Sequence, residues 1–91
     1  MESFDIKKFD EFFEAILKLK NKEDCRRFFE DVCTIKELQD VSQRLEVASL
    51  LSEGKNYQEI SKATGASTAT ISRVNKCLQY GKNGYQIVLK K

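Results

Sequence analysis

One segment of the chain carries short hydroxyl and cationic side chains at helical spacing. Thr68, Ser72 and Lys76 recur every four residues, so in a helix they share one face, with Ala69 and Arg73 beside them. Such a helix can enter the major groove of DNA deeply, where Ser and Thr bond base edges or phosphates and Ala contacts a thymine methyl. The pattern therefore predicts a DNA-reading surface.

Other polar residues extend this predicted surface. Ser67 is a good N-cap, and the N–H groups that follow it suit a phosphate. Lys62 and neighbouring lysines are candidates for backbone contacts, which position a protein on DNA without reading sequence. The predicted DNA-binding residues are Lys55, Gln58, Lys62, Ser67, Thr68, Ala69, Thr70, Ser72, Arg73 and Lys76, and Lys82 is a further candidate for a backbone contact.

The surrounding residues have the spacing of a helix-turn-helix. That motif needs an apolar and then a small residue in its first helix, a Gly where the backbone turns with φ > 0, and two apolar residues that clamp the second helix. These five places are filled, in order, by Ile60, Ser61, Gly65, Ile71 and Val74. A Gly-linked helical pair can also be only a packing unit, and the spacing alone leaves that alternative open.

The charge is divided unevenly along the chain. The formal net charge is only +2, but residues 1–54 carry 9 basic and 13 acidic side chains, whereas residues 55–91 carry 7 basic and 1 acidic. A polyanion would be attracted to the second segment, which contains the predicted helix-turn-helix. The alternative is an ordinary solvated surface with a chance imbalance.

Size and composition indicate one helical domain. A chain of 91 residues is too short for two cores, and 41% apolar residues with no Pro suit a helical protein. No apolar run approaches the ~20 residues of a membrane helix, and the N-terminus does not resemble a signal peptide. A cytoplasmic protein without a membrane partner is expected.

The sequence gives little support to an enzyme or a metal site. It has no His, and its three cysteines include no CxxC pair, so no common zinc set can be assembled. We expect Cys25, Cys33 and Cys77 to be reduced, partly buried thiols. Paired catalytic carboxylates in a recognisable setting and a nucleotide loop are also lacking, so no catalytic residue is predicted.

Periodicity and capping signals divide the chain into helices. We expect helices over about 5–20, 21–33, 34–53, 56–63 and 67–80, and a short helix or tail over 81–91. Three pairs have the spacing of caps at helix starts: Asn21 with Asp24, Thr34 with Glu37, and Asn56 with Glu59. Gly54 is suited to a left-handed helix end. The apolar residues of 34–53 recur at helical spacing: Ile35, Leu38, Val41, Leu45, Ala48 and Leu51. Residues 1–54 are assigned to dimerisation and residues 55–80 to the helix-turn-helix.

Phenylalanines are concentrated in the first two predicted helices. Their apolar surface is more than one short chain can cover, so we expect much of it to be buried between subunits of a homodimer. The residues are Phe4, Phe9, Phe12, Phe13, Phe28 and Phe29.

The stretch "YQEISKATGASTATISRVNKCL" resembles the Trp repressor family, and specifically its small bacterial branch of unassigned effector. The match is strongest over GASTATISR and continues upstream through TIKEL and QRLEVASLL. The resemblance implies an all-α, intertwined homodimer that places two recognition helices in successive major grooves of double-stranded DNA and reads a palindromic operator.

The resemblance also implies a corepressor site, which this chain matches in part. The family holds an amino acid through two arginines, a threonine and a serine, beside a glycine. Arg73 and Thr34 match, and Arg44 matches if one residue is missing between Gly54 and Ile60. Val74 replaces the glycine and Cys77 the serine, so this tentative ligand set departs from the family at two places.

These departures argue against tryptophan as an effector. A branched side chain would stand at the floor of the indole slot, and Cys is a poor hydrogen-bond partner for an amine. Val74 also fits a core position, and Arg44 and Arg73 could serve phosphate contact or interhelical pairing. No cofactor is expected, and another small-molecule effector stays open.

Together these observations predict a sequence-specific DNA-binding transcriptional regulator, most simply a repressor. The alternative is a helical dimeric adaptor without sequence-specific DNA binding. An adaptor needs no cationic face on residues 55–91, whereas a DNA-binding protein needs one and loses affinity as salt rises.

Overall fold

A computed structural model describes residues 6–89, which fold into six helices without a strand. The chain divides into two compact units, Met1–Ile35 and Lys36–Lys91. The second unit contains residues 36–54, which the sequence assigns to dimerisation, together with the helix-turn-helix. The predicted all-α fold is confirmed for the described residues.

The first unit consists of α1 (Ile6–Ile16) and α2 (Lys22–Val32), and neither helix buries a residue. Phe12 of α1 and Phe28 of α2 lie with their ring centroids 6.1 Å apart. Asn21 caps α2 as predicted, because its side chain accepts a hydrogen bond from the Asp24 N–H at 2.8 Å.

The first helix ends before its predicted end near residue 20. Lys18 N–H and Leu19 N–H donate to carbonyls three residues back, which tightens the chain into a turn. Lys20 N–H instead donates to the Asp24 carboxylate at 3.1 Å, so it belongs to the start of α2. The predicted start at Asp5, and Phe4, lie outside the described residues.

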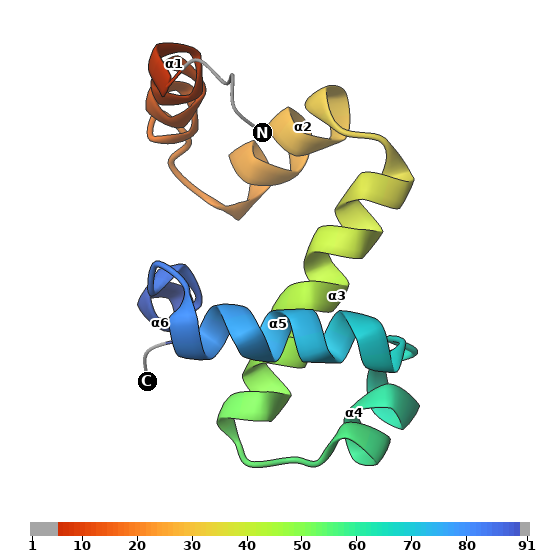
Figure 1. Cartoon of the computed structure of the whole chain (residues 1–91). Helices are drawn as coiled ribbons and strands as arrows, with labels where there is room; N and C mark the ends of the chain where they lie inside the picture. Colours follow the sequence, from red (N-terminus) through yellow and green to blue (C-terminus); the bar gives the residue numbers. More distant parts are fainter. Residues whose placement is uncertain (1–5, 90–91) are drawn as a thin grey trace. The chain divides into compact units, whose positions relative to one another are not determined.

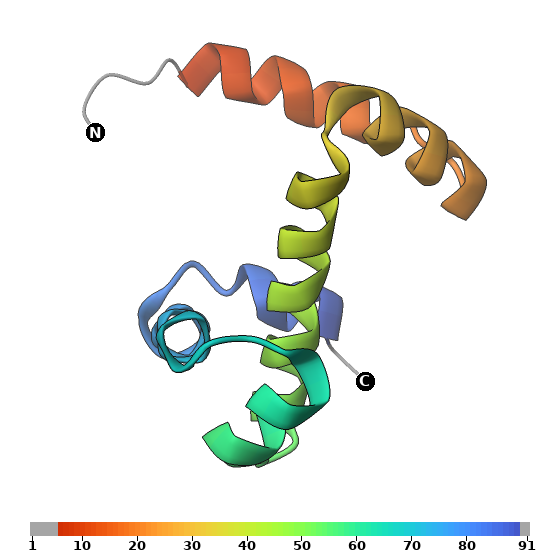
Figure 2. The same cartoon turned by 90° about the vertical axis from the view of Figure 1, so that its right-hand side faces the viewer.

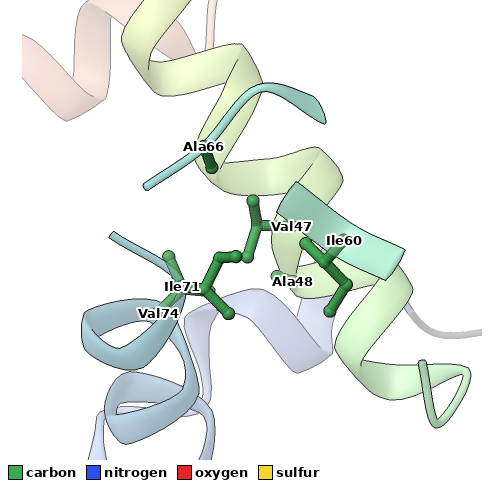
Figure 3. Packing of buried hydrophobic residues seen from close by; sticks show 6 residues of the cluster. All are labelled: Val47, Ala48, Ile60, Ala66, Ile71 and Val74. Atoms are coloured by element: carbon green, nitrogen blue, oxygen red, sulfur yellow. The ribbon is translucent and has the colours of Figure 1, made fainter. Parts of the chain in front are cut away.

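The second unit consists of α3 (Ile35–Ser52), α4 (Tyr57–Thr64), α5 (Thr68–Tyr80) and α6 (Gly84–Leu89). Figures 1 and 2 show α5 lying across α3, with α4 beside the C-terminal end of α3. Six side chains from α3, α4, α5 and the turn before α5 form the core (Figure 3): Val47, Ala48, Ile60, Ala66, Ile71 and Val74.

The predicted helix boundaries in this unit agree closely with the structure. Gly54 follows α3 with φ +87°, the left-handed conformation expected there. Asn56 and Glu59 form a reciprocal capping box at the start of α4. The short terminal helix, predicted within 81–91, is α6, and residues 90–91 lie outside the described part.

One expectation about burial needs correction. Cys25 and Cys77 are exposed and only Cys33 is half-buried, although all three thiols are free. The apolar stripe of α3 is partly exposed, since Val41 and Leu45 are 54% and 41% exposed. Helical periodicity identified the apolar face of α3, but only the part of this face near Val47 and Ala48 is buried within the chain.

Candidate nucleic-acid interface

The turn between α4 and α5 has the geometry that a helix-turn-helix requires. Gly65 ends α4 with φ +78°, and its N–H donates to the Ser61 carbonyl at 2.8 Å. The Ser61 hydroxyl donates to the Ala66 carbonyl at 2.9 Å. The predicted glycine turn is therefore confirmed, and the small residue in α4 also closes the turn with a hydrogen bond.

A second set of hydrogen bonds fixes this turn to α3. The Thr64 hydroxyl donates to the Ile60 carbonyl at 2.8 Å and accepts from the Ala66 N–H at 3.1 Å. Gln43 Nε2 of α3 donates to the Thr64 carbonyl at 3.1 Å. The role of Gln43 was not predicted, because its partner lies 21 residues away.

One side of α5 is buried and the other is open. Ile71 and Val74 are 0% and 1% exposed, and they pack with Ile60 of α4 in the core. The residues predicted to read DNA lie outside this buried stripe and are exposed: Thr68, Ala69, Ser72, Arg73 and Lys76. The structure therefore brings these five predicted residues together on one accessible side of a firmly seated helix.

Two predicted DNA contacts at the start of α5 also hold the helix end. Ser67 Oγ accepts from the Thr70 N–H at 3.1 Å, which confirms the predicted N-cap. The Ser67 hydroxyl donates to Thr70 Oγ1 at 3.2 Å, and Thr70 is half-buried. Thr70 thus lies on the flank of the reading side, while Ser67 stays exposed.

The cations of this region are accessible. Five cationic side chains are exposed: Lys55, Lys62, Arg73, Lys76 and Lys82. Within residues 6–89, no carboxylate lies within 4.0 Å of their side-chain nitrogens. Gln58 is exposed beside them on α4. The single acid in 55–91, Glu59, accepts the Asn56 N–H at 3.0 Å in the capping box. The positive charge is therefore left to face a polyanion.

A polar link between α4 and α5 was not predicted. Asn75 Nδ2 donates to the Tyr57 hydroxyl at 3.3 Å, and Gln79 Nε2 donates to Asn75 Oδ1 at 3.4 Å. Tyr57 also packs against the core. Asn75 and Gln79 therefore stabilise the position of α5 on the flank of its exposed side.

Within the second unit, the tentative ligand residues are divided between two spaces and the core. Arg44 and Cys77 line a cavity of about 590 Å³ bounded by α3, the end of α5 and α6. Arg73 and Cys77 line a separate hollow of about 270 Å³. Val74 lies in the core and lines neither space, which agrees with its alternative interpretation as a core residue. Thr34 belongs to the first unit.

The α6 segment contributes to the larger cavity in a way the sequence did not indicate. Tyr85 and Val88 of α6 line it opposite Val41 and Leu45 of α3. Gln86 Nε2 donates to the Leu78 carbonyl at 2.9 Å and joins α6 to the end of α5. The short terminal helix is thus part of the fold of the second unit.

Residues 6–89 offer no group of three or more His, Cys, Asp or Glu side chains that could hold a metal ion. Over the same range, no helix combines the length and apolar character needed to cross a membrane.

Comparison with known proteins confirms the predicted Trp-repressor-like fold. The family profile described as Trp repressor protein matches residues 7–91. The uncharacterized protein YerC of Bacillus subtilis (strain 168) is 55% identical over 83 residues, which span 91% of this chain and 80% of YerC.

Two solved structures are similar over most of the chain. A TrpR-like protein from Eubacterium eligens ATCC 27750 has a TM-score of 0.89 and 51% identity, covering 92% of this chain and 87% of that one. A proposed Trp repressor from Staphylococcus aureus has a TM-score of 0.86 and 48% identity, covering 96% and 92%.

Proposed function

Because this chain belongs to the Trp repressor family of DNA-binding regulators, we propose that it is a sequence-specific repressor that reads an operator with the exposed side of α5. One observation carries the proposal. Ile71 and Val74 hold one side of α5 in the core, while Thr68, Ser72 and Arg73 stay accessible on the other. A rigid helix with short polar side chains suits direct contact with base edges in the major groove.

The charges around α5 support the same proposal. The exposed lysines and arginine of 55–89 have no carboxylate partner within the described residues, so they are available for phosphates. Each neutralised phosphate of duplex DNA contributes about 0.9 to the slope of log affinity against log salt concentration. An adaptor would show no such slope.

Fluorescence anisotropy with a labelled random-sequence duplex at several salt concentrations tests this proposal. We expect weak binding that falls steeply with salt, and a smaller slope for Lys62→Gln, because Lys62 is exposed on α4. Lys22→Gln, in the acidic first segment, is the matched control and should behave like the unaltered chain. Absence of DNA binding at low salt would favour the adaptor.

We further propose that the protein acts as a homodimer on a palindromic operator. Large apolar side chains are exposed on α1, α3 and α6, including Phe13 at 53%, Val41 at 54% and Ile87 at 75%. Exposed apolar surface on this scale is typical of association sites. A second copy of the chain is the simplest cover, and its two-fold symmetry would be mirrored in the operator.

Tryptophan is not the proposed effector. Val74 stands where the family has Gly and is 1% exposed, so its side chain occupies the core and presents no open floor to a ring. Cys77, in the place of a serine, is an exposed thiol that offers only a weak hydrogen bond to an amine.

Thermal melts with and without tryptophan test this part of the proposal. A ligand at about 100 times its Kd would stabilise the folded state by about 2.7 kcal/mol, which raises the Tm of a domain this small by roughly 10 to 20 °C. We expect no shift with tryptophan and none with glycine, the control. A clear upward shift with tryptophan alone would contradict the proposal.

A further inference from the structure

Tyr80 is a large aromatic residue that the core does not use. It is the last residue of α5 and is 81% exposed. Its phenol makes no hydrogen bond to any other residue of 6–89. It lines the hollow of about 270 Å³ together with Arg73, Lys76, Cys77 and Gly81. No carboxylate is among the residues that line this hollow, and its surface consists mainly of the apolar parts of their side chains.

This hollow continues the DNA-reading side of α5. Ala69, Arg73, Lys76 and Tyr80 follow one another at intervals of four, three and four residues, which places them along one stripe of a helix. All four are exposed. The stripe begins among the residues proposed to read bases and ends at the phenol.

The length of α5 indicates what the far end of this stripe meets. At about 1.5 Å per residue, Tyr80 lies about 16 Å along the helix axis from Ala69. The major groove is about 12 Å wide. When α5 enters the groove by its N-terminal end, with its axis inclined to the groove, its C-terminal half reaches the sugar-phosphate backbone at the groove border.

The polar ends of the exposed Arg73, Lys76 and Tyr80 side chains suit a phosphodiester. Guanidinium, ammonium and phenol groups all donate hydrogen bonds, and a phosphate only accepts them. The backbone at Gly81 follows closely on α5, since a Cβ there would come within 2.4 Å of the Cys77 carbonyl oxygen. Gly81, directly after Tyr80, itself lines the hollow.

We propose that Tyr80, with Arg73 and Lys76, binds a phosphate of the DNA backbone at the border of the groove that α5 reads. This inference rests on the proposed function and adds to it a sequence-independent contact through a neutral donor. The phenol strengthens binding to every duplex equally, whereas Lys76 contributes charge and therefore salt dependence.

Anisotropy titrations with an operator-containing duplex and a random-sequence duplex, each at several salt concentrations, test the proposal. We expect Tyr80→Phe, which keeps the ring but removes the O–H, to weaken binding to both duplexes by about three- to tenfold without changing the salt slope. Lys76→Gln should lower the slope by about 0.9, because one phosphate is then no longer neutralised. Lys22→Gln is the matched control and should alter neither quantity.

The outcomes separate this inference from the proposed function. If the unaltered chain binds DNA and both variants bind like it, the phosphate site is wrong and the function stands. If the unaltered chain binds neither duplex, the proposed function itself fails. Tyr80→Ala is also studied by sedimentation without DNA, and a weaker self-association there would assign Tyr80 to an interface between copies and overturn the proposal.

Discussion

The two units of this chain are exposed in different ways. In the second unit, α3, α4 and α5 enclose six buried side chains, and what α5 leaves accessible is mainly polar or cationic. In the first unit, α1 and α2 bury no residue, and Phe9, Phe12 and Phe13 are 46%, 38% and 53% exposed.

This difference in exposed surface corresponds to two functions, ligand binding and association between subunits. A polar, cationic side on a helix whose other side lies in a core can meet a ligand such as DNA without further folding. An apolar side with no core beneath it is stable only when something apolar covers it. The second unit therefore holds the surface expected to read DNA. The first unit, together with the exposed apolar residues of α3 and α6, is expected to need a second copy.

The largest effect should come from opening the core of the second unit. Replacing Ile71 with Ala removes a fully buried side chain between α3 and α4 and should lower the free energy of unfolding by about 2 to 5 kcal/mol. Urea denaturation followed by circular dichroism measures it. Gln58→Ala, at an exposed site of α4, should stay within about 0.5 kcal/mol. Equal changes in the free energy of unfolding for the two variants would mean that α5 does not pack against α3 and α4 as described.

A smaller loss is expected at the turn. Gly65 has φ +78°, which a β-branched residue resists, so Gly65→Val should cost about 1 to 3 kcal/mol. The cost comes from the backbone, because a Cβ there would meet only Gln43 Nε2, at 4.0 Å. Gly84→Val is the control, since a Cβ at Gly84 meets nothing within 4 Å. Chemical denaturation compares the two, and similar stabilities would contradict the role of the turn.

The first unit should respond through association. Phe13→Ser removes a half-exposed ring from α1, and we expect it to weaken self-association by about tenfold, as loss of a buried interface aromatic does. Sedimentation velocity at micromolar concentration measures this. Glu14→Ser, the next residue and also exposed, is the matched control. A monomeric unaltered chain would overturn the dimer proposal.

The features that the sequence predicts well are local. The cap at Asn21, the capping box at Asn56 and the turn at Gly65 each depend on residues three or four apart, and all are present as expected. The five-place pattern of the helix-turn-helix works for the same reason. Its spacing predicts which side of α5 is buried, and Ile71 and Val74 on that side are indeed buried.

The features that the sequence missed depend on distant partners. Asn75 bonds Tyr57 18 residues away, and Gln43 bonds the Thr64 carbonyl across the fold. Periodicity identified an apolar face on α3 but could not predict that Val41 would be exposed and would line a cavity with residues of α6. The corepressor residues were grouped by resemblance, and only the packing of α5 reveals that Val74 belongs to the core while Cys77 does not.

Selection of bound sites from a random duplex library tests the central claim most directly. We expect the unaltered chain to enrich a palindromic consensus, and Thr68→Ala with Ser72→Ala to change that consensus while the free energy of unfolding stays within about 0.5 kcal/mol. Both side chains are exposed, so their loss should affect reading rather than folding. No enrichment by the unaltered chain, or an unchanged consensus in the double variant, would contradict the assignment of this side of α5 to sequence reading.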